Sequence, residues 1–159
     1  VGVYKMEITI STDPQGSQSI GQGEKIILQA TNPSYVQLIA PGQQVGAAQS
    51  ANIYTEFPVF QWNGNGDEYQ VVVFERKRML SSLDDILNSR PNWESERTSA
   101  LSLQYPQGNQ TIPLEFGKTY FWMVRMFIQS SSGEEKVNSE VWYFNLVDPA
   151  NRGNAQAQV

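Results

Sequence analysis

The chain has 159 residues, a net charge of −5 at pH 7 and 40 % hydrophobic residues, a composition typical of one folded domain with additions. It contains no cysteine and no histidine, which excludes disulfides, thiol nucleophiles, serine–histidine triads and thiolate or histidine zinc sites. The acidic pI near 4.7 argues against a nucleic-acid partner, and no apolar run reaches the roughly 18 to 20 residues that span a bilayer.

Two strands are predicted at the N-terminus. Tyr4 to Ile10 alternates apolar and polar side chains, and Lys25 to Ala30 is a second strand beyond a polar stretch with Gly and Pro, so the pair predicts a hairpin with a long loop. A lone hairpin cannot bury a core. We therefore expect residues 1–31 to join the main sheet, to pack on its surface, or to be the remnant of a preceding domain. The start lacks an initiator Met and a secretory signal, which indicates a mature or excised fragment.

The next strands lie on either side of a small-residue loop. Tyr35 to Ala40 is bracketed by the turn dipeptides Asn32-Pro33 and Pro41-Gly42. A further strand covers the stretch FPVFQW, in which Pro58 would remove a ladder hydrogen bond. Pro58 therefore belongs at a strand start or on a sheet edge.

The stretch WNGNGDEYQVVV, which begins at Trp62, either holds a cation or turns the chain. Asn63, Asn65 and Asp67 have the spacing of the first ligands of a calcium loop, but the Gly and the Glu expected at its sixth and twelfth positions are missing. Two Asn-Gly pairs are typical of turn residues with φ > 0 that join two strands. We expect a turn, followed by a strand from Tyr69 to Glu75, and no metal site.

One short helix is predicted after that strand, because the apolar spacing changes to that of a helix. Ser81 or Ser82 is the expected N-cap, two aspartates occupy the first turn, and Pro91 lies beyond the end. The apolar positions are Leu83, Ile86 and Leu87.

Three more strands complete the prediction. They are Thr98 to Tyr105, Tyr120 to Ile128, and the stretch VWYFNLV, with SSSGEEKVNSE as a turn between the last two. About seven strands with regular turn signals indicate an all-β, antiparallel two-sheet sandwich. Residues 148–159 are expected to form a flexible tail.

Several short motifs occur in an order that resembles the fibronectin type III-like (immunoglobulin-like) sandwich domains of bacterial extracellular and cell-envelope proteins. Their order is FPVFQW, YQVVVFE, LQY, PLEFGKTYFWMVRMF and SEVWYFNL. Trp62 matches the inward Trp of the second strand, and Tyr69 matches the aromatic that opens the third. Leu114, Gly117 and Tyr120 match the residues that lead into the sixth strand.

The resemblance covers roughly residues 33 to 147. It implies a sandwich at residues 32–147, with one short helix inserted after the third strand and the N-terminal β-hairpin outside the domain. Members of that family usually act as spacers, scaffolds or binding modules, so the resemblance brings no catalytic residue and no cofactor.

An apolar outer sheet face is the most informative candidate site. If the even-numbered side chains of residues 120 to 128 face the core, alternation places seven others outside: Val72, Phe74, Phe121, Met123, Arg125, Phe127 and Tyr143. Antiparallel sheets usually show water a polar face, so such a face must be covered or used. Either the short helix or the hairpin covers it, or it docks a neighbouring domain, a second copy of the chain, or an envelope partner.

The expected function is a non-catalytic structural or interaction module of a larger secreted, periplasmic or cell-surface bacterial protein, acting as spacer or docking domain. Its expected partners are proteins, including a homodimer formed through the hairpin or the outer face, with no nucleic acid and no membrane insertion. A carbohydrate-binding module with Trp93 as the glycan contact is the alternative. A small glycosidase is more distant, because the only paired carboxylates have simpler explanations as helix or loop charges: Asp84-Asp85, Glu94-Glu96 and Glu134-Glu135.

Overall fold

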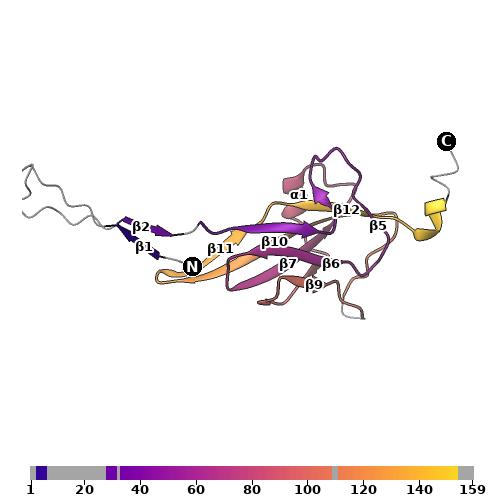
Figure 1. Ribbon diagram of the computed structural model, residues 1–159. Helices are drawn as coiled ribbons and strands as arrows, with labels where there is room; N and C mark the ends of the chain where they lie inside the picture. The colour runs from indigo at the N-terminus through magenta and orange to yellow at the C-terminus, as the bar shows by residue number, and fades with distance from the viewer. Residues whose placement is uncertain (1–2, 7–27, 32, 109–110, 154–159) are drawn as a thin grey trace, which may run out of the picture. The chain divides into compact units, whose positions relative to one another are not determined.

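The computed structural model describes residues 3–6, 28–31, 33–108 and 111–153 (Figure 1). By its internal contacts the chain divides into two compact units, Val1–Pro33 and Ser34–Val159, and each is described by itself.

The first unit contains a two-stranded antiparallel sheet. Strand β1 (Val3–Met6) pairs with β2 (Leu28–Thr31), with Val3 opposite Thr31. The two N-terminal strands therefore pair with each other, as predicted. The other predicted residues of these strands, up to Ile10 and from Lys25, lie outside the described part of the chain.

The second unit is a sandwich of two sheets. The larger sheet has seven strands in the order β4-β12-β10-β7-β8, and β11 and β5 join it by pairing with β10 and β12. The smaller sheet has the order β3-β6-β9. Pairing is antiparallel throughout except between β5 and β12. An all-β two-sheet sandwich is therefore confirmed, and it is compatible with an immunoglobulin-like or fibronectin III-like domain.

The larger sheet contains β4 (Gln43–Gln44), β5 (Asn52–Ile53), β7 (Glu68–Glu75), β8 (Trp93–Glu94), β10 (Thr119–Ser130), β11 (Gly133–Asn138) and β12 (Trp142–Leu146). The smaller sheet contains β3 (Val36–Ala40), β6 (Val59–Gly64) and β9 (Ser102–Gln104). The helices are α1 (Leu83–Leu87) and a 3-10 helix, η1 (Pro149–Gly153).

The core lies between the two sheets and is rich in aromatic rings. On β10 the even-numbered side chains enter it, and Trp122 is fully buried, with its ring 4.8 Å from that of Phe60 on β6. The Trp122 indole N–H donates to the Pro41 carbonyl (3.0 Å), which satisfies its polar atom. The predicted orientation of residues 120 to 128 is confirmed, since Tyr120, Val124 and Met126 are also fully buried.

The residues that lead into β10 form a compact corner. Leu114 is buried in the core, and Gly117 has φ +83°, a value that favours glycine. The Tyr120 hydroxyl accepts a hydrogen bond from the Glu115 backbone N–H (2.8 Å). This bond ties the loop before β10 to the start of that strand.

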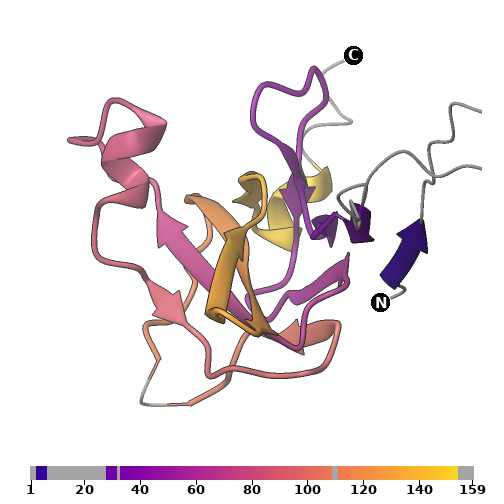
Figure 2. The same cartoon turned by 90° about the vertical axis from the view of Figure 1, so that its left-hand side faces the viewer.

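The helix α1 is short and well capped. The Ser82 hydroxyl accepts from the Asp85 N–H (3.1 Å), and the Asp85 carboxylate accepts from the Ser82 N–H (3.1 Å), which forms a capping box. These bonds to Ser82 lower the pKa of Asp85. Figure 2 shows α1 in pink on the same side of the sandwich as the end of β7. Of the two predicted caps, Ser82 is correct.

Several stretches differ from the sequence prediction. The short strands β4, β5 and β8 were not predicted, and β9 covers only Ser102–Gln104 of the strand expected from Thr98 to Tyr105. SSSGEEKVNSE contains the strand β11 rather than only a turn, and its first half has two successive acidic residues that break the apolar alternation. Pro149–Gly153, within the predicted flexible tail, forms a 3-10 helix, and residues 154–159 lie outside the described part. Pro58 directly precedes β6, as predicted for a proline at a strand start.

Candidate functional site

The predicted apolar outer face is covered by the chain itself. Ile86 of α1 packs into a cluster with outward-facing side chains of β7 and β10, and Phe121 is only 8 % exposed. The partly buried residues Leu80, Leu83, Leu87, Val141 and Tyr143 complete this cluster around Val72, Phe74 and Met123. Of the alternatives left open by the sequence, cover by the helix is the one found. The expectation that these apolar side chains are presented to a partner is corrected, because they are buried in the single chain.

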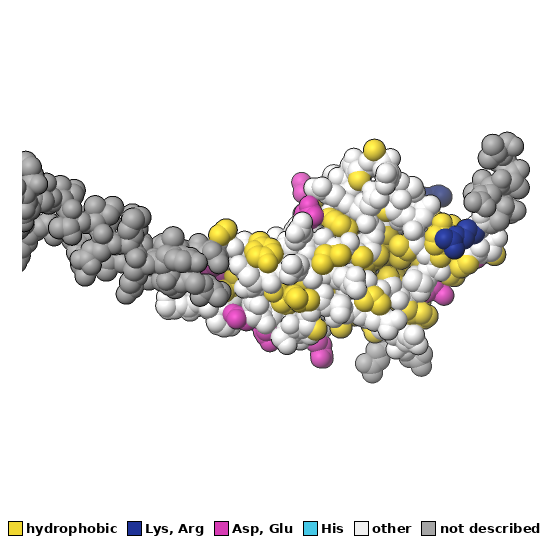
Figure 3. Space-filling model, viewed as in Figure 1, with side chains coloured by type: hydrophobic (Ala, Val, Ile, Leu, Met, Phe, Trp, Pro, Cys, Tyr) yellow, Lys and Arg dark blue, Asp and Glu magenta, His cyan; other side chains and the backbone are white. Residues whose placement is uncertain are grey.

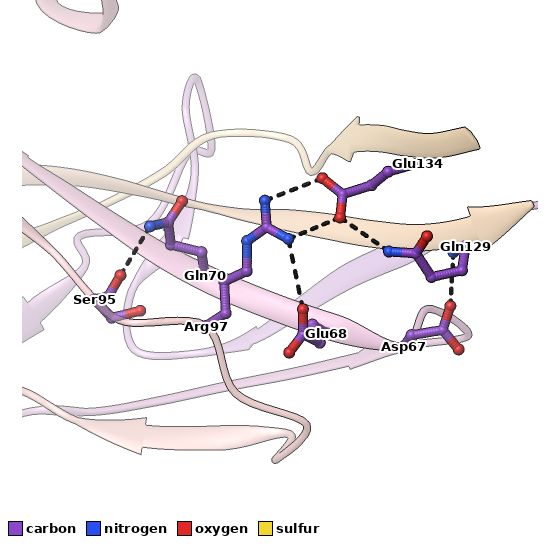
Figure 4. A network of polar contacts seen from close by, with 7 residues as sticks. All are labelled: Asp67, Glu68, Gln70, Ser95, Arg97, Gln129 and Glu134. Carbon is purple, nitrogen blue, oxygen red and sulfur yellow. Dashed lines mark hydrogen bonds and ion pairs between the residues drawn. The ribbon is translucent and has the colours of Figure 1, made fainter.

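Phe127, the remaining apolar residue of that face, is covered by the side chain of Arg97, whose polar contacts are shown in Figure 4. The Arg97 guanidinium lies over the Phe127 ring, 3.6 Å from its centroid. It also donates a bidentate pair of hydrogen bonds to the Glu134 carboxylate (2.8 and 3.0 Å). Arg97 also approaches Glu68 (3.5 Å). Donation from Arg97 lowers the pKa of Glu134.

Arg125, the charged member of the predicted face, is also engaged within the chain. Its guanidinium pairs with Glu94 (3.0 Å) and lies 3.4 Å from the Gln70 amide oxygen. Gln70 in turn donates to the Ser95 carbonyl (2.8 Å), which ties the loop after β8 to the sheet (Figure 4). Around Arg125 the outer face is thus occupied by a network of polar side chains that bond to one another.

The stretch from Asn63 to Asp67 turns the chain between β6 and β7. Its polar groups hold neighbouring backbone: the Asn65 side chain accepts from the Tyr35 N–H (2.9 Å), and the Asp67 carboxylate accepts from the Gln129 N–H (2.8 Å). A turn is confirmed, but the predicted positive φ at its glycines is wrong, because neither Gly64 nor Gly66 has one.

Close packing explains the glycines of that turn instead. A Cβ at Gly66 would overlap Met126, with the sulfur at 2.8 Å, and would lie 3.1 Å from the Phe127 carbonyl oxygen. A Cβ at Gly64 would lie 2.9 Å from the Tyr69 ring. Both positions need glycine because core side chains and backbone approach them.

One carboxylate of each pair has a structural role. Asp85 caps α1, Glu94 pairs with Arg125, and Glu134 pairs with Arg97. The pKa of Asp85 and that of Glu134 are lowered, whereas a catalytic general acid needs a raised value. Within the described residues no group of three or more potential metal-ligating side chains occurs, and no helix there is long and apolar enough to cross a membrane.

Trp93, the predicted glycan contact, is half-buried rather than free. Its ring lies 5.0 Å from Tyr105 and 6.1 Å from Phe60, and β8 pairs it with Val73. It also lines a cavity of about 360 Å³ together with residues 90–94 and 111–112. The sequence did not identify this cavity, because its two walls are 20 residues apart in the chain.

The outer face of the smaller sheet is a second surface that the sequence analysis missed. Its strands alternate buried and exposed residues, and none of the outward side chains is charged: Gln37, Ile39, Val59, Gln61, Asn63, Ser102 and Gln104. Ile39 is 54 % exposed and Val59 is 45 % exposed. Figure 3 shows mainly yellow and white side chains where β3 and β6 lie in Figure 1, with acidic side chains toward the margins.

In comparisons with known proteins, the chain matches no family model, no curated protein and no solved structure.

Proposed function

We propose that the chain is a non-catalytic interaction module of a larger secreted or cell-envelope protein, and that its docking surface is the outer face of β3-β6-β9. The observation that carries this proposal is the absence of charge from the outward positions of those three described strands. Charged residues are depleted at the centre of protein interfaces, whereas an exposed antiparallel sheet face usually carries them. The opposite face of the sandwich is sealed by α1 and the Arg97 network.

The finer assignment of the sandwich, as a fibronectin type III-like domain, belongs to the same proposal. It is supported by the separate three-strand sheet packed on a larger sheet, and by the corner at Leu114, Gly117 and Tyr120. In sandwiches of this class a tyrosine near the start of the sixth strand bonds back to the backbone a few residues upstream. Domains with this architecture serve many functions, so the proposed role rests on the surface rather than on the fold.

The occupant we propose for the face is a second copy of this chain. In a two-fold dimer the same patch meets itself, so each group must be able to pair with its own kind. Glutamine amides satisfy that condition because they donate and accept, whereas like charges repel. In a chain of net charge −5, an uncharged face is where two copies meet with least repulsion.

The expected association is weak, because the face is small. Three strands spaced about 4.8 Å apart give a patch well below the roughly 800 Å² per partner of a standard stable interface. Concentration-dependent dimers with a dissociation constant on the order of 10⁻⁴ M are therefore expected, at about −5.5 kcal/mol. In the larger protein, several linked copies would strengthen this contact through their high local concentration.

Sedimentation velocity over increasing protein concentration tests the proposal. Gln61 lies at the centre of the face, so Gln61→Glu would place two like charges against each other across the two-fold axis. Gln107→Glu makes the same charge change at an exposed loop residue and is the matched control. We expect the wild type and Gln107→Glu to self-associate equally, and Gln61→Glu to remain monomeric.

Two results would remove this docking surface. One is a wild-type chain that stays monomeric up to about 1 mM, where a contact of about −4.1 kcal/mol would be half formed. The other is Gln61→Glu associating as strongly as the control.

A further inference from the structure

The cavity beside Trp93 contains polar groups that nothing else in the described chain uses. Arg90, which lines it, has no ion pair and no hydrogen bond among the described residues. The Trp93 indole N–H likewise has no partner there, and it is not sealed from solvent. Two residues with uncommitted donors, one of them charged, therefore line the same cavity.

Asn92 supplies an acceptor beside these donors. Its amide nitrogen donates to the Tyr105 hydroxyl (2.9 Å) and lies 3.4 Å from the Ile112 carbonyl. The Tyr105 hydroxyl itself donates to the same carbonyl (2.6 Å). These bonds hold the Asn92 amide in place, while its side-chain oxygen has no partner within the described residues.

The wall formed by Trp93 is rigid. The ring packs on Tyr105 (5.0 Å) and Phe60 (6.1 Å), both buried in the core, and its backbone pairs with β7. A site held by packed core residues needs little ordering when a ligand binds. Ile112, which is 51 % exposed, adds apolar surface to the lining.

The free charge of the cavity is positive. Glu94 also lines it, but its carboxylate is paired with Arg125 (3.0 Å) and lies 3.2 Å from the Gln70 amide nitrogen. Among the described residues Arg90 has no such counter-charge. The volume of about 360 Å³ is near the lower end of small-molecule sites, which suits a single ring rather than a long chain.

From this arrangement we propose that the cavity binds an acidic sugar, a hexose-sized ring with a carboxylate. Arg90 holds the carboxylate, Trp93 lies against the ring and donates its N–H, and the Asn92 oxygen accepts from a ring hydroxyl. The ligand is either a free sugar acid or one residue of an acidic polysaccharide. This binding site lies on β8, the loop before it and the loop between β9 and β10, and it goes beyond the proposed docking role of the smaller sheet.

Titration followed by ¹⁵N–¹H nuclear magnetic resonance tests the site in the whole chain. The chain has four tryptophans, so the indole N–H of Trp93 can be followed separately after assignment. The probes are glucuronate, galacturonate and a galacturonate oligomer, with glucose and acetate as controls at constant ionic strength. We expect the Trp93 signal to shift and saturate with the sugar acids at millimolar concentration, and to move far less with either control.

Binding by both monomer and oligomer with equal affinity per ring would identify a single-sugar site, and tighter oligomer binding would identify a polysaccharide site. Arg90→Gln should weaken sugar-acid binding about tenfold, which corresponds to about 1.4 kcal/mol. Arg78→Gln makes the same charge change at an exposed residue outside the cavity and should leave binding unchanged.

The proposal is overturned if no sugar acid shifts the Trp93 signal, or if glucose or acetate shifts it equally. It is also overturned if Arg90→Gln binds as tightly as Arg78→Gln.

Discussion

Removing the side chain of Ile86 should uncover the outer face of the larger sheet. Ile86 is the buried residue of α1, 4 % exposed, and it packs with Phe121 and Met123. The helix has five residues, far fewer than an isolated helix needs for stability, so packing holds it in place. Ile86→Ala therefore removes both buried methyl groups and the anchor of the cover.

The expected cost of Ile86→Ala is about 3 kcal/mol of unfolding free energy, within the range of about 2 to 5 kcal/mol measured for such truncations. Ile86→Val should cost about 1 kcal/mol, because it removes one methylene. Met79, in the connection before the helix, is 95 % exposed, so Met79→Ala should change stability by less than about 0.5 kcal/mol.

Urea unfolding of the three variants measures these differences, and binding of the dye ANS reports exposed apolar surface in the folded state. We expect Ile86→Ala to bind ANS under native conditions and Met79→Ala not to. The reasoning fails if Ile86→Ala costs no more than Met79→Ala and binds no dye, since α1 would then not be the cover of this face.

Three further predictions concern the cap, the turn and the buried phenol. Ser82→Ala removes the capping box and should lower the unfolding free energy by about 1 kcal/mol in urea; an unchanged midpoint would contradict the cap. Gly66→Ala places a methyl group against Met126 and should cost about 1 to 3 kcal/mol, and a neutral result would show that the turn has more space than described. Burial raises the pKa of Tyr105 to about 12 from 10.0, because the protein favours the protonated phenol. The contribution of this phenol to the unfolding free energy is therefore fully present below pH 10 and is lost as the pH rises toward 12. Unfolding free energies of wild type and Tyr105→Phe should therefore converge over that range, and a constant difference would contradict the shift.

The strands with clear alternation were predictable from the sequence. In β10 every second residue is apolar and enters the core, and β3, β6, β7, β9 and β12 also lie where such patterns were found, whereas β4, β5 and β8 were not predicted. Period-two alternation is enough to place side chains on opposite faces, because successive side chains of a strand point to opposite sides of the sheet. Alternation does not indicate what covers a face. The sequence left open whether the helix covers this one, and the structure shows Ile86 packed on Phe121.

The strand β11 was missed for a related reason. Glu134, Glu135 and Lys136 follow one another, so no apolar side alternates with a polar one, and the strand exists through its pairing with β10. The turn glycines show a similar limit. Asn-Gly pairs favour φ > 0, but Gly66 is required by the approach of Met126, a contact between residues 60 positions apart.

Neither proposed site could be assembled from the sequence, although Trp93 was named there as a possible glycan contact. The uncharged face arises from three strands that are far apart in the chain, and single glutamines such as Gln61 carry no signal alone. The cavity needs residues 90–94 and 111–112 side by side, and the bonds of Asn92 and Tyr105 bring them together. Both features depend on tertiary contacts that no local pattern specifies.

Amide chemical shifts recorded over a dilution series test most directly which face of the sandwich makes contacts. If the docking surface is the outer face of β3-β6-β9, shifts at residues such as Gln37, Gln61 and Gln104 will change with concentration, while those of α1 and the covered side of β10 will not. Concentration-dependent shifts at Ile86 and Phe121, with β6 unaffected, would contradict the assignment of the docking surface.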